Sequence, residues 1–192
     1  MNGTMAIDNR RRGNGLRPFV WGAAACLLLL PALAMQFFPQ GGVDWTGADF
    51  LVMGVMLATA CGLYELGAWL SGASTYRAGF GLAAQAAFLT VWVNLAVGML
   101  GSENDVANLM FVGVPGIAAA GALLARFKPR GMARAMAAAA IAQLLATGVG
   151  LAMGAFEARE LVLTALFALP WLAAALLFRM AARDQPPAGE AG

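Results

Sequence analysis

The sequence predicts an all-α fold, namely a polytopic bundle of six transmembrane helices with both chain ends in the cytoplasm. Of its 192 residues, 61% are hydrophobic and only 11% are charged, and the mean hydropathy is +0.73. A chain of this composition must expose most of its surface to lipid. Since about 20 apolar residues are needed to cross the hydrocarbon core of a bilayer, there is room for six crossings and no separate soluble domain.

A second observation is that apolar stretches alternate with short polar turns along the chain. The expected spans cover approximately residues 19–38, 50–70, 78–100, 109–127, 132–156 and 161–180. Residues 1–18 form a basic cytoplasmic segment, and residues 181–192 are expected to be a disordered cytoplasmic tail. The first span has the basic leader of a signal peptide, but its apolar stretch continues to Phe38. We therefore expect it to be retained, with cleavage as the alternative.

The third observation is the placement of the basic residues, because Lys and Arg resist transfer across a membrane while Asp and Glu contribute little to orientation. In the six-span topology, every basic residue except Arg159 falls on one side. The opposite loops hold the acidic residues Asp44, Asp49, Glu103, Asp105, Glu157 and Glu160. Both ends are therefore expected to be cytoplasmic. Lys128 is the only lysine, and Ala and Gly are abundant. This composition is typical of proteins encoded by GC-rich bacterial genomes, so we expect a bacterial inner membrane.

Small residues and prolines predict how the spans pack. Helices in lipid associate through close backbone approach, which small side chains permit. The fifth span, residues 132–156, is rich in Ala and Gly, so we expect it at the centre of the bundle. Pro31, Pro115 and Pro170 lie inside spans one, four and six. Each lacks a backbone donor and invites a kink.

Polar side chains at membrane depth are the best candidates for chemistry, because they cost free energy and usually face the bundle interior. The candidate intramembrane polar site consists of Glu65, Gln85, Asn94 and Gln143. Glu65 lies roughly 7 Å below the cytoplasmic boundary, at 1.5 Å per residue. It is either a proton- or cation-coupling carboxylate or one half of a structural ion pair, with Arg77 or another arginine at that face.

The amide side chains in the spans have two interpretations, a polar path or interhelical hydrogen bonds. Gln85 and Asn94 are nine residues apart, which at 100° per residue puts them on opposite faces of one helix. A continuous path through both is thereby disfavoured. Interhelical hydrogen bonds are the favoured role.

A basic cluster at the fourth loop is a candidate contact for anionic lipid headgroups. It consists of Arg126, Lys128, Arg130 and Arg134. Topology alone also explains its position, and the two explanations are compatible. The net charge of +2 is too small to suggest a nucleic-acid partner. The expected partners are the bilayer, anionic headgroups, and either further copies of the chain or another membrane protein.

The composition argues against a metal or haem centre, and no cofactor is expected. Histidine is absent, which removes the commonest transition-metal ligand and general base. Cys26 and Cys61 lie singly inside apolar spans and are expected to be small apolar filler. The loop at residues 101–108 collects oxygens that calcium could use, but its spacing matches no EF-hand. Asp105 or Asn108 as the N-cap of span four explains the same residues.

Several segments carry a resemblance to a known group of proteins. They are residues 92–98 (WVNLAVG), 101–105 (GSEND), 108–110 (NLM), 125–135 (ARFKPRGMARA), and 29–31 and 34–37 in the first span. These segments resemble a group of small, uncharacterised multispan membrane proteins common in proteobacteria. The resemblance covers most of the chain and tapers at both tails, and Lys128 stands where arginine is expected. It implies residence in a bacterial membrane and no particular activity.

Three classes of function follow. The favoured class is a structural or accessory membrane protein, such as an assembly factor or a lipid-responsive subunit, because the loops are too short to house a site. The alternative is a small proton- or cation-coupled transporter or channel that uses Glu65. A membrane enzyme acting on lipid or quinone is the least favoured class, because it needs converging acid, base or metal groups.

Overall fold

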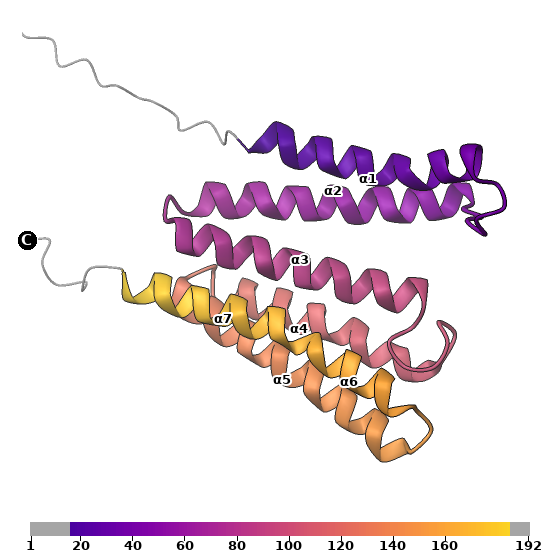
Figure 1. Ribbon diagram of the computed structural model, residues 1–192. Helices are drawn as coiled ribbons and strands as arrows, with labels where there is room; N and C mark the ends of the chain where they lie inside the picture. The colour runs from indigo at the N-terminus through magenta and orange to yellow at the C-terminus, as the bar shows by residue number, and fades with distance from the viewer. Residues whose placement is uncertain (1–15, 185–192) are drawn as a thin grey trace, which may run out of the picture. The chain divides into compact units, whose positions relative to one another are not determined.

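The computed structural model describes residues 16–184, and within that range the regular structure is entirely helical (Figure 1). The arginines at positions 10–12 and residues 185–192 of the predicted tail lie outside the described residues. Residues 181–183, also placed in that tail by the sequence, continue the last helix. Six helical spans in the described range are long and apolar enough to cross a membrane. The predicted fold class, an all-α transmembrane bundle with six spans, is therefore confirmed.

The helices follow the predicted spans closely. They are α1 (Arg17–Phe37), α2 (Gly47–Leu70), α3 (Ser74–Ala96), the 3₁₀ turn η1 (Val106–Asn108), α4 (Leu109–Leu124), α5 (Pro129–Met153), α6 (Ala158–Leu166) and α7 (Ala168–Arg183). The turn η1 leads directly into α4, and α6 and α7 together make the sixth span.

The third span differs most from its predicted bounds of 78–100, because it begins and ends four residues earlier. Gly98 and Gly101 have φ angles of +78° and +63°, which turn the chain out of the helix. Met99 and Leu100 between them are nevertheless buried. Their hydropathy predicted a helix, but they join the core from a loop.

The fourth span ends at Leu124 instead of the predicted residue 127. Arg126 and Phe127 have φ angles of +48° and +57°, and the Phe127 amide donates to the carbonyl of Ala122. The Tyr76 hydroxyl donates to the Phe127 carbonyl at 2.8 Å and stabilises this unusual turn. A helix can then restart at Pro129, where a missing amide hydrogen is tolerated in the first turn.

The sixth span is divided at Phe167 into α6 and α7. Pro170 has no amide hydrogen to donate to the carbonyl of Leu166 four residues earlier, and the Phe167 amide instead makes a tighter bond to the Thr164 carbonyl. Pro31 and Pro115 lie inside helices that continue without interruption. Of the three predicted kinks, only the one at Pro170 therefore interrupts a helix.

The chain divides into two compact units, residues 1–61 and residues 62–192. In the first unit, Thr46 precedes α2, and its amide and hydroxyl both donate to the Asp49 carboxylate at 2.7 Å. Also within this unit, the Cys61 thiol lies 3.9 Å from the carbonyl of Val20 on α1. These contacts begin α2 and join it to α1.

In the second unit, α3, α4, α5 and α7 close a four-helix bundle, because each packs against two of the others (Figure 1). The core is filled by aromatic side chains such as Trp171 and Phe178 and by many alanines. A Cβ atom at Gly121 of α4 would lie only 2.6 Å from the Ala135 Cβ of α5, so these two helices approach closely. The predicted central place of the fifth span is shared: α5 packs on α4, α6 and α7, and α7 packs on α3, α5 and α6.

Candidate functional site

One buried side chain, Asn108, holds the loop between α3 and α4 in its folded form. Its Oδ1 accepts from the amides of Met99 and Leu100 at 2.8 and 3.0 Å. Its Nδ2 donates to the carbonyls of Leu100 and Ser102 at 3.1 and 2.7 Å. Asn108 is only 3% exposed, so these bonds satisfy backbone groups that water reaches poorly.

Two further polar side chains connect this loop to the helices beside it. The Thr164 hydroxyl on α6 donates to the Met99 carbonyl at 2.9 Å. The Gln143 Nε2 on α5 donates to the Thr164 carbonyl at 3.0 Å. Asn108, Thr164 and Gln143, which we call the polar ties, thus join the loop, α6 and α5 through side-chain to backbone bonds.

The sequence-predicted capping of the α3–α4 loop holds for one of its two candidates. The Asp105 carboxylate accepts from the amide of Ala107 at 2.9 Å and caps η1. Asn108 precedes α4 but makes no side-chain cap there. Its side chain instead bonds to the backbone of Met99, Leu100 and Ser102 in the loop.

The four residues of the predicted intramembrane polar site occupy different environments. Gln143 is completely buried and Asn94 is 6% exposed, whereas Gln85 is exposed, as the opposite faces of a helix require. Glu65 is half-buried in α2, and this residue has an interaction partner. Of these four, only Gln143 belongs to the polar ties.

Several buried polar atoms have no hydrogen-bond partner among the described residues. They are Thr90 Oγ1, Asn94 Oδ1, Gln143 Oε1 and Trp171 Nε1. Thr90 and Asn94 are four residues apart and so share one face of α3. A buried polar group without a hydrogen-bond partner lowers stability by about 1–3 kcal/mol.

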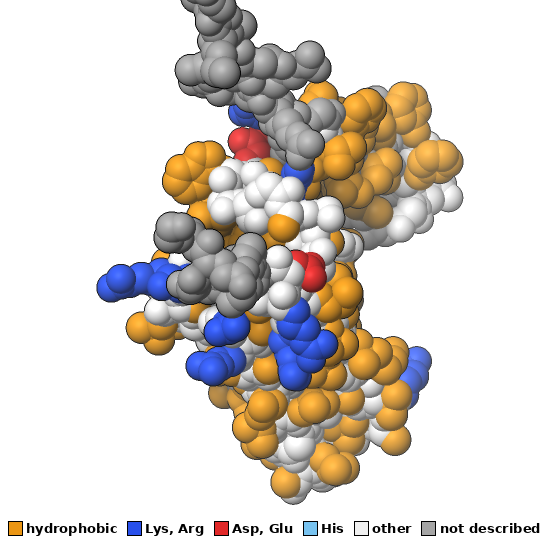
Figure 2. All heavy atoms as spheres, turned by 90° about the vertical axis from the view of Figure 1, so that its left-hand side faces the viewer, with side chains coloured by type: hydrophobic (Ala, Val, Ile, Leu, Met, Phe, Trp, Pro, Cys, Tyr) orange, Lys and Arg blue, Asp and Glu red, His pale blue; other side chains and the backbone are white. Residues whose placement is uncertain are grey.

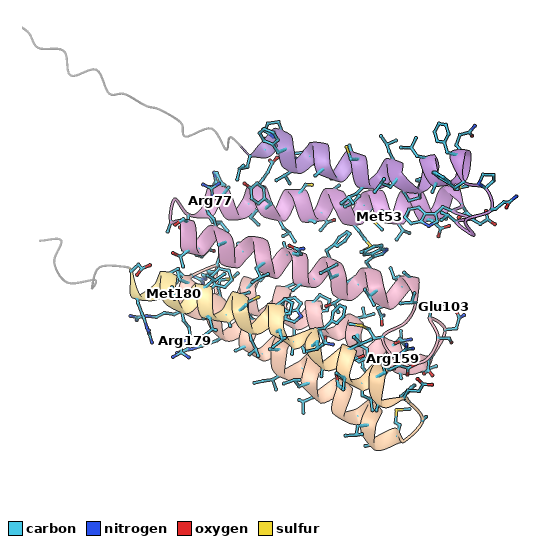
Figure 3. All side chains as sticks on the ribbon, viewed as in Figure 1. Met53, Arg77, Glu103, Arg159, Arg179 and Met180 are labelled. Atoms are coloured by element: carbon cyan, nitrogen blue, oxygen red, sulfur yellow. The ribbon has the colours of Figure 1, made fainter. Side chains whose placement is uncertain are left out.

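The second polar feature lies at the other end of the second unit (Figure 3), where Arg179 is found opposite to Glu103 and Arg159. An open groove of about 600 Å³ runs between the beginning of α5 and the end of α7. Its walls carry four guanidinium groups, those of Arg130, Arg134, Arg179 and Arg183. We call this feature the arginine groove.

The arginine groove overlaps only in part with the basic cluster that the sequence places at the fourth loop. Arg130 and Arg134 line it, but Arg126 and Lys128 are not among its lining residues, because both precede α5 in the turn that follows α4. Arg179 and Arg183 line the groove from α7. Figure 2 shows Lys and Arg side chains gathered on the end of this unit where α5 begins and α7 ends.

An apolar pocket of about 310 Å³ lies between the helices of the second unit. Phe80 of α3, Pro115 of α4, Met136 of α5 and Trp171 of α7 are among the side chains that line it. The pocket presents almost no polar surface. It is therefore suited to hydrocarbon and not to ions.

Within residues 16–184, no group of three or more His, Cys, Asp or Glu side chains is placed to hold a metal ion. Cys26 is exposed and Cys61 is buried, and both are free thiols. Each lies within a span, as the sequence predicts.

By the length and composition of its helices, the chain is a multi-pass membrane protein. Comparisons with protein-family models, with curated proteins and with solved structures give no match.

Proposed function

We propose that this protein is a structural or accessory subunit of a bacterial inner membrane that supports the assembly or stability of other membrane components. The observation that carries the proposal is the use of the polar ties. Asn108, Thr164 and Gln143 connect segments to one another through backbone bonds. Side chains engaged in this way fix a framework in one arrangement.

The outer faces of the helices support the same role. Leu123 and Leu124 at the end of α4 are 65% and 86% exposed. Within a bilayer, such side chains contact lipid tails or the apolar face of another membrane protein. A rigid frame with a broad apolar exterior is suited to packing beside a partner.

Coupled transport through Glu65 is the alternative function. Glu65 is an ionisable side chain, half-buried within a helix long enough to cross the membrane. Ionisable residues at such positions commonly move protons or cations. A membrane enzyme is less favoured than either.

Two measurements, both of which include Glu65→Gln, test this proposal. The first compares the abundance of membrane complexes, by quantitative proteomics, between cells that make the protein and cells from which its gene has been deleted. We expect one complex to be depleted, and to be restored by the wild type and by Glu65→Gln.

The second measures proton and cation flux into liposomes that contain the purified protein, with Glu103→Gln as the control for loss of an exposed loop carboxylate. We expect no flux above that of empty liposomes. A flux that persists in Glu103→Gln and disappears in Glu65→Gln would instead establish the transporter.

A further inference from the structure

The arginine groove brings together two pairs of like charges that the fold does not require. Arg130 and Arg134 are four residues apart on α5, and Arg179 and Arg183 are four residues apart on α7. Residues at this spacing are neighbours on one helix face, and like charges there destabilise a helix by about 0.2–0.5 kcal/mol per pair. Orientation in the membrane needs cations at this end, but it does not need all four in one groove.

The floor of the groove explains why the four side chains face the same space. Ala133 and Ala182 are buried beneath it, and Ala137 is half-buried. These small residues let α5 and α7 pack closely, while the long arginine stems rise on either side. All four arginines are exposed.

Within residues 16–184, no carboxylate forms an ion pair with these four guanidinium groups. None of the four guanidinium groups takes part in an ion pair or a hydrogen bond with the described residues. Asp184 is the carboxylate nearest in sequence, and it makes no ion pair with them either. The beginning of α5 adds the partial positive charge of a helix N-terminus at the same end, while the end of α7 offsets part of it.

Each row of arginines continues along its helix into exposed apolar side chains. On α5, Ile141 and Leu145 follow Arg134 on the same face and are 57% and 65% exposed. On α7, Leu176 precedes Arg179 on the same face and is 59% exposed. The surface is therefore cationic at the end of the bundle and apolar toward its middle.

We propose that the arginine groove binds the phosphate group of an anionic phospholipid, whose acyl chains lie along the apolar faces of α5 and α7. Guanidinium groups form planar, bidentate hydrogen bonds with phosphate oxygens, and four of them converge where a headgroup would sit. The adjoining apolar rows distinguish a lipid from a free phosphate compound, because only a lipid also covers those rows. The proposal does not depend on the accessory role, since a transporter could carry the same site.

The test measures retention of phosphatidylglycerol by the full-length protein in detergent, using native mass spectrometry. The double variant Arg134→Gln and Arg179→Gln removes one guanidinium from each helix. We expect at least about a tenfold loss of binding, because charge-assisted bonds to phosphate are strong. The matched control, Arg126→Gln with Lys128→Gln, makes the same change in net charge at the same end but outside the groove, and we expect less than about a twofold effect. Unchanged thermal unfolding of both variants shows that each is folded.

Two results would overturn this assignment. Equal losses in the two double variants would mean that binding follows net charge and not the groove. Displacement of phosphatidylglycerol by millimolar inorganic phosphate or pyrophosphate would identify a soluble phosphate compound as the ligand. A further variant, Arg134→Lys with Arg179→Lys, keeps the charge but loses the planar donors. We expect it to bind less tightly than the wild type, and full binding would contradict the proposed geometry.

Discussion

Asn108 is the side chain on which the α3–α4 loop depends most directly. Its side-chain oxygen accepts hydrogen bonds from two backbone amides, and its side-chain nitrogen donates to two backbone carbonyls. Gly98 fits tightly beside it, since a Cβ atom there would lie 2.8 Å from the Asn108 Nδ2. No other residue type supplies two acceptor and two donor bonds in so small a space.

Replacement of Asn108 by Ala is expected to destabilise the protein strongly. The amides of Met99 and Leu100 would lose their partner, and a buried unpaired donor costs about 1–3 kcal/mol. Thermal unfolding in detergent should show a clear decrease in the midpoint. The control is Asn104→Ala in the same loop, which removes only an exposed bond to Glu103 and should have little effect. Equal midpoints for the two variants would refute the role given to Asn108.

Gln143 is expected to behave differently, although it is buried more deeply. Gln143→Met removes one bond to Thr164, but it also removes an amide oxygen that has no partner. The Thr164 carbonyl keeps its bond from the Phe167 amide. The free energy of unfolding should therefore change by less than about 1 kcal/mol. A loss as large as that of Asn108→Ala would show that Gln143 has an essential role beyond this bond.

At the scale of the elements, the contact between α4 and α5 depends on the absence of a side chain at Gly121. A Cβ atom there would lie 2.6 Å from the Ala135 Cβ, a distance that forces the helices apart. Gly116 lies on the same helix, and a Cβ atom there would meet nothing within 4 Å. The two glycines therefore make a matched pair.

Gly121→Ala is expected to destabilise the bundle by about 1–3 kcal/mol, as overpacking of a tight contact does. Gly116→Ala should cause no loss, because alanine favours the helix and meets no neighbour. Thermal unfolding of both variants in the same detergent gives the comparison. If Gly121→Ala were as stable as the wild type, the close approach of α4 and α5 would not be required for stability.

The elements also show what the sequence could and could not predict. Apolar length located all six spans, because a bilayer imposes that length on any helix that crosses it. It failed at Met99 and Leu100, since hydropathy measures burial and does not distinguish a buried loop from a helix. The bond between Thr164 and Met99 joins residues 65 positions apart, and no local pattern indicates it.

The arginine groove illustrates the same limit. The sequence shows that Arg130 and Arg134 of its α5 side belong to one basic cluster, because they stand close together in one short segment. The sequence does not show that Arg179 and Arg183 join them, because these two residues reach the groove only through the packing of α7 against α5. Their four-residue spacing was a visible signal, but the sequence does not say which helix lies opposite.

At the scale of the whole molecule, the distribution of charge defines how the chain should lie in the membrane. Within the second unit, Arg77 and Arg179 lie at one end, and Glu103 and Arg159 lie at the other (Figure 3). The positive end should face the cytoplasm. The arginine groove would then meet the cytoplasmic leaflet, and the polar ties would lie near the opposite surface.

Labelling of single cysteines in intact and opened cells tests both the six-span topology and the side of the membrane on which the arginine groove lies. Cys26→Ser and Cys61→Ala provide the background, into which Ser102→Cys or Asp184→Cys is introduced. Three spans separate these exposed positions, so they should lie on opposite sides of the membrane. We expect an impermeant maleimide to label Ser102→Cys in intact spheroplasts, and to label Asp184→Cys only after the membrane is opened. The reverse pattern would invert the orientation and place the arginine groove in the other leaflet, while labelling of both positions from one side would contradict the six-span fold.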